Sequence, residues 1–139
     1  MTATVPSLTD VTDKSKAQGV VVFVCRSCRA EADPTAEPRA GATLAQTVSA
    51  LGKDEGVTVR SVNCLANCKR GLSAAIRTQD GWSYIFGGLA QDDAADLLVG
   101  ARLLENAPDG LMPWRGRPDS LKRGMVARIP ALHHTEETP

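Results

Sequence analysis

The residues of this chain best suited to chemistry are its four cysteines, which form two close pairs. Cys25 and Cys28 enclose two residues, whereas Cys64 and Cys68 enclose three. Two close pairs separated by a long segment are typical of a metal centre, because each pair binds as a unit and the fold must bring the two units together. The sequence therefore predicts a centre held by sulfur ligands.

Four kinds of chemistry fit these cysteines: a 2Fe-2S cluster, a structural zinc ion, a thioredoxin-type dithiol at Cys25 and Cys28, and unligated thiols. A dithiol catalyst places its first cysteine at a helix N-terminus, whereas here a proline-rich stretch follows the pair. Structural zinc sites commonly have two-residue spacers in both pairs, which favours iron-sulfur and leaves zinc as the alternative. Basic residues that could offset thiolate charge flank the pairs: Arg26, Arg29, Lys69 and Arg70.

The composition indicates one domain with tails. The chain has 139 residues, of which 42% are hydrophobic, enough to bury a core without cross-links. Lysine plus arginine and aspartate plus glutamate each total 16, so the overall charge favours neither nucleic acid nor a membrane as partner. No apolar segment typical of a signal peptide opens the chain. We therefore expect a cytoplasmic protein, whose paired cysteines serve metal or redox chemistry rather than disulfides.

The elements that position the cysteines follow from the hydrophobic pattern. Residues 20–24 form a continuous β-branched and aromatic run, which predicts a buried central strand ending at Cys25. A helix is predicted over about 43–53, with Thr43 and Gln46 as a capping box, and a second strand over 57–62. A strand, helix and strand joined by short links form a right-handed parallel crossover, which brings both strand ends to one edge of the sheet. The two cysteine pairs would meet there.

An antiparallel hairpin and a second helix are predicted next. Residues 73–78 and 82–86 flank an Asp-Gly turn, and the aromatic side chains of the second strand are assigned to core packing. Asp92 and Asp93 suit the first turn of the following helix. The buried stripe predicted for this helix comprises Ala94, Leu97, Leu98, Ala101 and Leu104. Neither a phosphate-binding loop nor a catalytic triad is recognisable, so we expect no enzymatic activity.

The last part of the chain contains prolines and glycines, which interrupt regular elements, together with large apolar residues and an excess of basic residues. We expect residues 108–139 to form an irregular extension that either packs across the domain or forms an interface. Its positive charge complements the acidic stretch 80–109, which predicts a homodimer, with folding back on the same domain as the alternative. His133 and His134 could bind a metal ion, although adjacent histidines near a terminus are more often inert.

The segment Val62-Asn63-Cys64-Leu65-Ala66-Asn67-Cys68, followed by a basic turn and a hairpin, resembles the thioredoxin-like 2Fe-2S ferredoxins. That family includes the thioredoxin-like iron-sulfur subunit of the respiratory NADH dehydrogenase. The predicted elements from Val20 to Ala107 match its element order. The resemblance implies an α/β thioredoxin-like ferredoxin fold, with a mixed sheet of about four strands and two main helices. It also implies that the cluster is held by the four cysteines, Cys25, Cys28, Cys64 and Cys68.

A narrower resemblance rests on Cys-x-x-Cys, on Cys-x-x-x-Cys-Lys-Arg-Gly, and on the tail segment Trp114-Arg115-Gly116-Arg117-Pro118. These motifs are similar to a bacterial family of predicted metal-binding proteins of unknown function. We divide the chain into a flexible tail (1–18), a thioredoxin-like ferredoxin domain (19–107) and the basic extension (108–139). The expected function is electron transfer to a redox partner protein, with zinc binding or metal handling by the same cysteines as the alternative.

Overall fold

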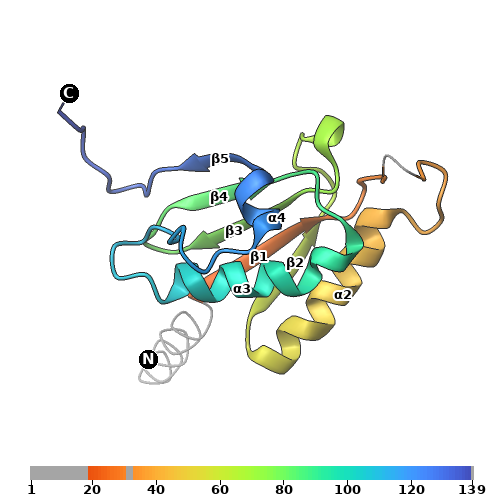
Figure 1. Ribbon diagram of the computed structural model, residues 1–139, viewed down its shortest axis with the longest axis horizontal. Coiled ribbons are helices and arrows are strands. Elements are labelled where there is room, and N and C mark those ends of the chain that lie inside the picture. Colours follow the sequence, from red (N-terminus) through yellow and green to blue (C-terminus); the bar gives the residue numbers. More distant parts are fainter. Residues whose placement is uncertain (1–18, 31–32, 139) are drawn as a thin grey trace, which may run out of the picture.

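The computed structural model describes residues 19–30 and 33–138, so the predicted tail 1–18 lies outside the described residues. A single five-stranded sheet, in the order β2-β1-β3-β4-β5, forms its centre (Figure 1). The strands are β1 (Val20–Cys25), β2 (Thr58–Val62), β3 (Ala74–Thr78), β4 (Ser83–Phe86) and β5 (Met125–Ile129). The helices are α2 (Ala40–Glu55), α3 (Ala94–Glu105) and α4 (Asp119–Arg123), with 3-10 turns η1 (Cys68–Arg70) and η2 (Gln91–Asp93).

Strand β1 lies inside the sheet, between a parallel and an antiparallel neighbour. It pairs in parallel with β2, which follows it after α2, and antiparallel with β3. Strands β3 and β4 form the predicted antiparallel hairpin. The mixed sheet therefore confirms the predicted central strand, the parallel crossover pair and the hairpin, with five strands rather than about four.

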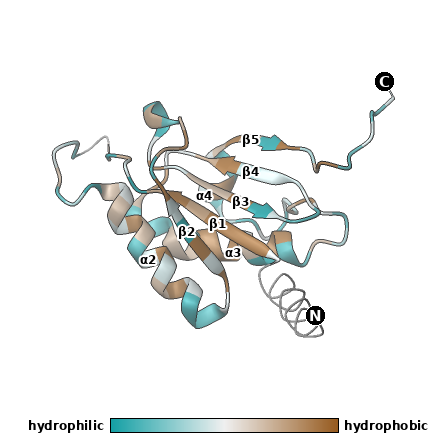
Figure 2. Cartoon of the chain, turned by 180° about the vertical axis from the view of Figure 1, so that it is seen from behind, coloured by the Kyte–Doolittle hydropathy of each residue, from teal (hydrophilic) through white to brown (hydrophobic). Residues whose placement is uncertain are grey.

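Helices α2 and α3 pack on the same side of the sheet and against each other (Figures 1 and 2). Alternate residues of β1, namely Val20, Val22 and Val24, are fully buried, and β1 is among the most hydrophobic strands in Figure 2. The predicted buried stripe of α3 is confirmed at every position. Asp93, just before α3, accepts a hydrogen bond from the amide of Ala90 and so satisfies a free donor at the helix start.

Helix α2 begins three residues earlier than predicted, and the capping box at Thr43 and Gln46 was wrong. The residue before the helix is Arg39, whose side chain makes no cap hydrogen bond. The amide of Gly41 instead donates to the carbonyl of Cys28 at 2.9 Å. This donor is satisfied by a loop that lies earlier in the sequence, which a local pattern does not reveal. Gly56 ends α2 in the left-handed conformation, with φ 73°.

The expectation of an irregular C-terminal extension was wrong for residues 119–129, which form α4 and β5. Strand β5 pairs antiparallel with β4 and adds an edge to the sheet. Leu121 of α4 is fully buried. Arg117 donates to the backbone carbonyls of Met112 and Pro113, which holds the intervening loop against the domain. The extension thus folds back on its own domain. This is the arrangement predicted as the alternative to an interface.

Within the described part of the chain, no helix has both the length and the apolar character needed to cross a membrane.

We expect Leu121→Ala to destabilise the protein by about 2–5 kcal/mol, because it removes a fully buried side chain and leaves a cavity beside α3. The free energy of unfolding in urea measures this change. Leu132→Ala is the matched control, because Leu132 is fully exposed, and it should leave the free energy unchanged within about 0.5 kcal/mol. Equal effects of the two substitutions would show that α4 is not part of the folded core.

Candidate metal centre

Strands β1 and β2 are parallel and end at the same end of the sheet (Figure 1), and the two cysteine pairs lie at or just after these strand ends. Cys25 is the last residue of β1 and pairs with Val62, the last residue of β2. Cys28 follows in the loop after β1, Cys64 lies two residues beyond β2, and Cys68 begins η1. The parallel register therefore brings the predicted cysteines together at one edge, as the strand pattern indicated.

The first pair is buried beneath the surface. Cys25 is 1% exposed and Cys28 is 4% exposed. The turn that ends at Gly71 lies directly on Cys28, since a β-carbon at this glycine would lie 3.2 Å from its Sγ atom. The start of α2 covers the pair from another side, because a β-carbon at Gly41 would overlap the carbonyl oxygen of Cys25. Glycine is therefore required at position 41, whereas a side chain at position 71 would need Cys28 to shift by a few tenths of an ångström.

The start of α2 also changes one argument made from the sequence. The proline-rich stretch was expected to keep the first cysteine pair away from a helix N-terminus. The structure contradicts this expectation, because the loop returns and places the first turn of α2 against Cys28. A dithiol catalyst is disfavoured instead by the burial of Cys25 and Cys28, since a thiolate nucleophile must be accessible to its substrate.

The second pair is exposed and spaced for a single metal ion. The Sγ atoms of Cys64 and Cys68 lie 4.0 Å apart, close to the ~3.8 Å expected for two thiolates on one tetrahedral ion. Ala66 adopts a positive φ of 60°, and its amide donates a hydrogen bond to Cys64 Sγ at 3.1 Å. A hydrogen bond of this kind to a sulfur ligand would raise the reduction potential of an iron ion bound there.

Asn63 joins the two cysteine loops. Its carbonyl accepts a hydrogen bond from the hydroxyl of Ser27 and lies 3.8 Å from Cys25 Sγ. Its side-chain oxygen accepts from Arg26 Nε at 2.7 Å. Asn63 and Ser27 were not predicted as site residues, although each is a polar residue next to a cysteine. These contacts hold the loop after β1 against the loop after β2.

Each pair contains one thiol whose pKa is raised. Burial and the neighbouring Cys25 raise the pKa of Cys28 from 9.0 to about 11. Burial also raises the pKa of Cys25, but hydrogen bonds from Cys28 and Ser27 outweigh it, and the net shift is downward. The neighbouring Cys64 raises the pKa of Cys68. Metal binding to these pairs must therefore release protons, because the ligands bind as thiolates.

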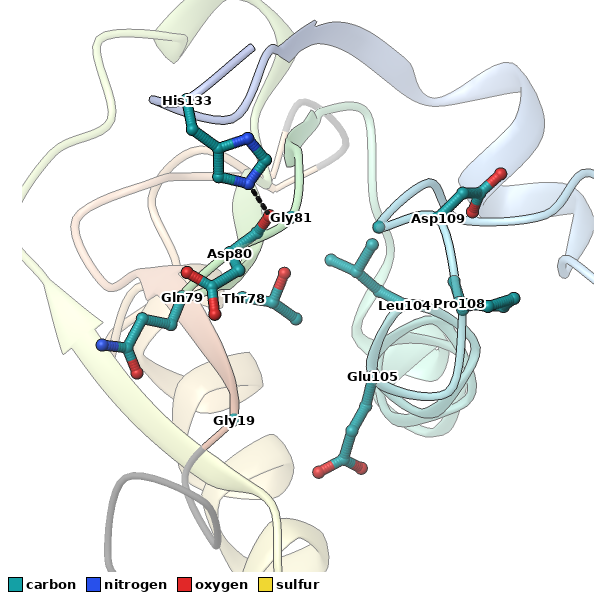
Figure 3. Close-up of a pocket in the computed structure, with 12 residues that line it drawn as sticks. Gly19, Thr78, Gln79, Asp80, Gly81, Leu104, Glu105, Pro108, Asp109 and His133 are labelled. Carbon is teal, nitrogen blue, oxygen red and sulfur yellow. Dashed lines mark hydrogen bonds between the residues drawn. The ribbon is translucent and has the colours of Figure 1, made fainter. Parts of the chain in front are cut away.

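The histidines near the C-terminus lie at the opposite end of the sheet. His133 Nε2 lies 3.1 Å from the carbonyl oxygen of Asp80, in the hairpin turn after β3 (Figure 3). His134 pairs with Glu137 at 3.1 Å. Thr78, beside this turn, pairs with Val20 at the start of β1, whereas Cys25 ends that strand. The structure therefore does not bring the histidines to the cysteines.

No three Cys, His, Asp or Glu side chains of residues 19–30 and 33–138 converge closely enough to hold one ion. The cysteines instead lie as two adjacent pairs.

A family model described as "Protein of unknown function (DUF1636)" matches residues 22–131, which include all four cysteines. The chain belongs to this family. The narrower resemblance to a family of predicted metal-binding proteins is not confirmed, because the description of this family names no metal. No curated protein matches the chain.

Solved structures of a thioredoxin-like [2Fe-2S] ferredoxin from Aquifex aeolicus are similar to the chain. One has a TM-score of 0.51 and 14% sequence identity, and the match covers 80% of this chain and 93% of that one. A crystal structure of the wild-type ferredoxin gives a TM-score of 0.48 and 15% identity, covering 79% and 98%. At this identity the likeness concerns the fold. The predicted thioredoxin-like ferredoxin fold is confirmed.

We expect the two cysteine pairs of the metal-free chain to react differently with iodoacetamide. At pH 8, Cys64 and Cys68 should be labelled at least about tenfold faster than Cys25 and Cys28, because the first two are exposed. Cys28 should stay the slowest as the pH rises to 10, since its pKa of about 11 keeps it protonated. Peptide mapping by mass spectrometry measures each rate. In urea all four should react alike, and equal rates in the folded chain would contradict the buried first pair.

Proposed function

We propose that this chain is a 2Fe-2S electron carrier, with Cys25, Cys28, Cys64 and Cys68 as the cluster ligands. The observation that carries the proposal is the parallel register of β1 and β2, which places the two cysteine pairs side by side at one end of the sheet. Asn63 links the two loops that hold them. The family description names no function, so the proposal rests on these residues and on the fold.

The donor set fits a centre with two metal ions. Two separate cysteine pairs suit a binuclear cluster, which divides four thiolates between two irons. The amide of Ala66 donates a hydrogen bond to Cys64 Sγ. Arg26, Lys69 and Arg70 lie close to cysteines in the sequence and would offset the negative charge of thiolate ligands. The protein with the similar fold is a [2Fe-2S] ferredoxin, which supports the same cofactor here.

The expected chemistry is the transfer of single electrons between protein partners. A 2Fe-2S cluster accepts and donates one electron, and four cysteine ligands leave no position for substrate. The buried Cys25 and Cys28 would shield one side of the centre from water. The exposed Cys64 and Cys68 would form the side that a partner reaches. We therefore favour a carrier over an enzyme.

Zinc is the second candidate, because the 4.0 Å separation of Cys64 Sγ and Cys68 Sγ also suits one zinc ion. Such a protein would be colourless and would contain one zinc per chain. It would stabilise the fold or handle metal without transferring electrons.

We expect Cys64→Ala to abolish the visible absorption of protein purified without oxygen and to lower its stability, because metal binding is coupled to folding. Iron and sulfide analysis should fall in parallel. Lys69→Ala is the control, since Lys69 is exposed beside Cys68 and carries no ligand atom for iron. It should keep the absorption. If the wild-type protein stays colourless after cluster reconstitution and contains one zinc ion per chain, the electron-carrier proposal is wrong and the zinc proposal takes its place.

A homodimer remains a prediction from the charge distribution. The extension packs on its own sheet, but it leaves Trp114 57% exposed and Ile129 52% exposed. Light scattering at low salt should give twice the 14.7 kDa mass of one chain. A monomer at high protein concentration would refute the dimer.

A further inference from the structure

Four exposed basic residues belong to the loops, turns and helix end near the exposed cysteine pair. Arg26 lies beside Cys25 and reaches Asn63, next to Cys64. Lys69 and Arg70 follow Cys68 in η1. Arg123 is distant in sequence, but its carbonyl accepts a hydrogen bond from Arg70 at 3.4 Å. We call these four residues the basic collar.

The charges of the basic collar are not neutralised by carboxylates within the described part of the chain. All four side chains belong to exposed residues. The ion pairs found there are Arg29–Glu37, Arg102–Glu105 and His134–Glu137, and none involves the collar. At this end of the sheet Glu37 is engaged with Arg29, and Asp92 is the exposed carboxylate of η2.

The opposite end of the sheet carries the reverse charge. A hollow of about 580 Å³ lies there, between the hairpin turn and the end of α3. Asp80, Glu105 and Asp109 line it, as Figure 3 shows, and Glu105 pairs with Arg102 at 3.2 Å. The collar therefore lies at the opposite end of the sheet from the carboxylates of Asp80 and Asp109. A charge distribution of this kind orients an approaching charged partner before contact.

We propose that the basic collar is the docking surface for a redox partner protein with an acidic patch. The inference rests on the proposed function, because Arg26, Lys69 and Arg70 of the collar lie close in sequence to the cysteines from which an electron would leave. Opposite charges steer association and fix its orientation. Nucleic-acid affinity is supplied mainly by the number of phosphates that lysine and arginine neutralise, and four cations on a chain with no net charge offer few such contacts. The patch therefore fits a protein of opposite charge.

Docking on the collar brings the partner to Cys64 and Cys68 rather than to the buried pair. One electron passes from the reduced carrier to an oxidised acceptor, which becomes reduced by one electron. No bond forms or breaks, and the chain transfers no proton. The four basic side chains act as positioning residues, because they hold the acceptor near the exposed edge without changing the ligand set.

The test measures binding of the full chain to two electron carriers, the acidic flavodoxin and the basic cytochrome c, by isothermal titration calorimetry. We expect flavodoxin to bind at 20 mM salt and to lose affinity at least tenfold at 500 mM. The double variant Lys69→Glu with Arg123→Glu should weaken binding at low salt by at least tenfold. Neither side chain makes a hydrogen bond or ion pair within residues 19–30 and 33–138, so the fold should persist, and circular dichroism checks this.

The matched control is Lys53→Glu with Arg115→Glu, which changes the net charge equally away from the collar. Lys53 lies in the last turn of α2, and Arg115 precedes Gly116, which packs near Leu103 late in α3. The control should bind flavodoxin as the wild type does. Equal loss in both double variants, tighter binding of cytochrome c, or tighter binding of a random single-stranded DNA decamer would overturn the docking proposal.

Calorimetry does not depend on a bound cluster, so it separates this proposal from the proposed function. If the protein contains zinc and flavodoxin still binds through the collar, the docking proposal is supported and the electron-carrier proposal is wrong. If the cluster spectrum is present and the collar variant binds flavodoxin as tightly as the wild type, the carrier stands and the docking surface is wrong. For the cluster-containing protein, stopped-flow oxidation by flavodoxin should slow in the collar variant and not in the control.

Discussion

The parallel pairing of β1 with β2 is the constraint on which the arrangement of the cysteines depends. Parallel strands of equal register end at the same edge of a sheet, so the pairing of Cys25 with Val62 fixes where both loops begin. Helix α2, the crossover between these strands, returns to the same edge and covers the first cysteine pair. A shift of one residue in this register would turn the side chains of β2 to the other face and separate the loops. The packing of α2 and α3 on the alternate valines of β1 opposes such a shift.

Much of this arrangement could be predicted from the sequence, because the relevant signals are local. The β-branched run of β1, the Asp-Gly turn between β3 and β4 and the apolar stripe of α3 each identify their element. Strand β5 carries no such signal, since it is an exposed edge strand and needs no alternation of apolar residues. The start of α2 depends on the carbonyl of Cys28, and the role of Asn63 depends on two loops that meet only in space. These contacts join distant parts of the sequence, which a local pattern does not describe.

The two cysteine pairs are unequal, and the inequality follows from their positions relative to α2. The first pair lies beneath the helix start and beside Gly71, which leaves little room for water. The second pair lies on a loop and a 3-10 turn at the surface, where the amide of Ala66 contacts sulfur. A centre held by both would be enclosed on one side and open on the other. On the open side, Arg70 donates a hydrogen bond to the backbone carbonyl of Arg123, which joins η1 to the end of α4.

The outer strands of the sheet have a further consequence. Strands β2 and β5 are the two edges, and each has a row of backbone groups that another chain could pair with. Each carries an exposed arginine, Arg60 in β2 and Arg128 in β5, and Pro130 follows β5 without a backbone donor. Strand addition from a second copy would crowd these guanidinium groups. These charges and the proline discourage strand addition at both edges of the sheet.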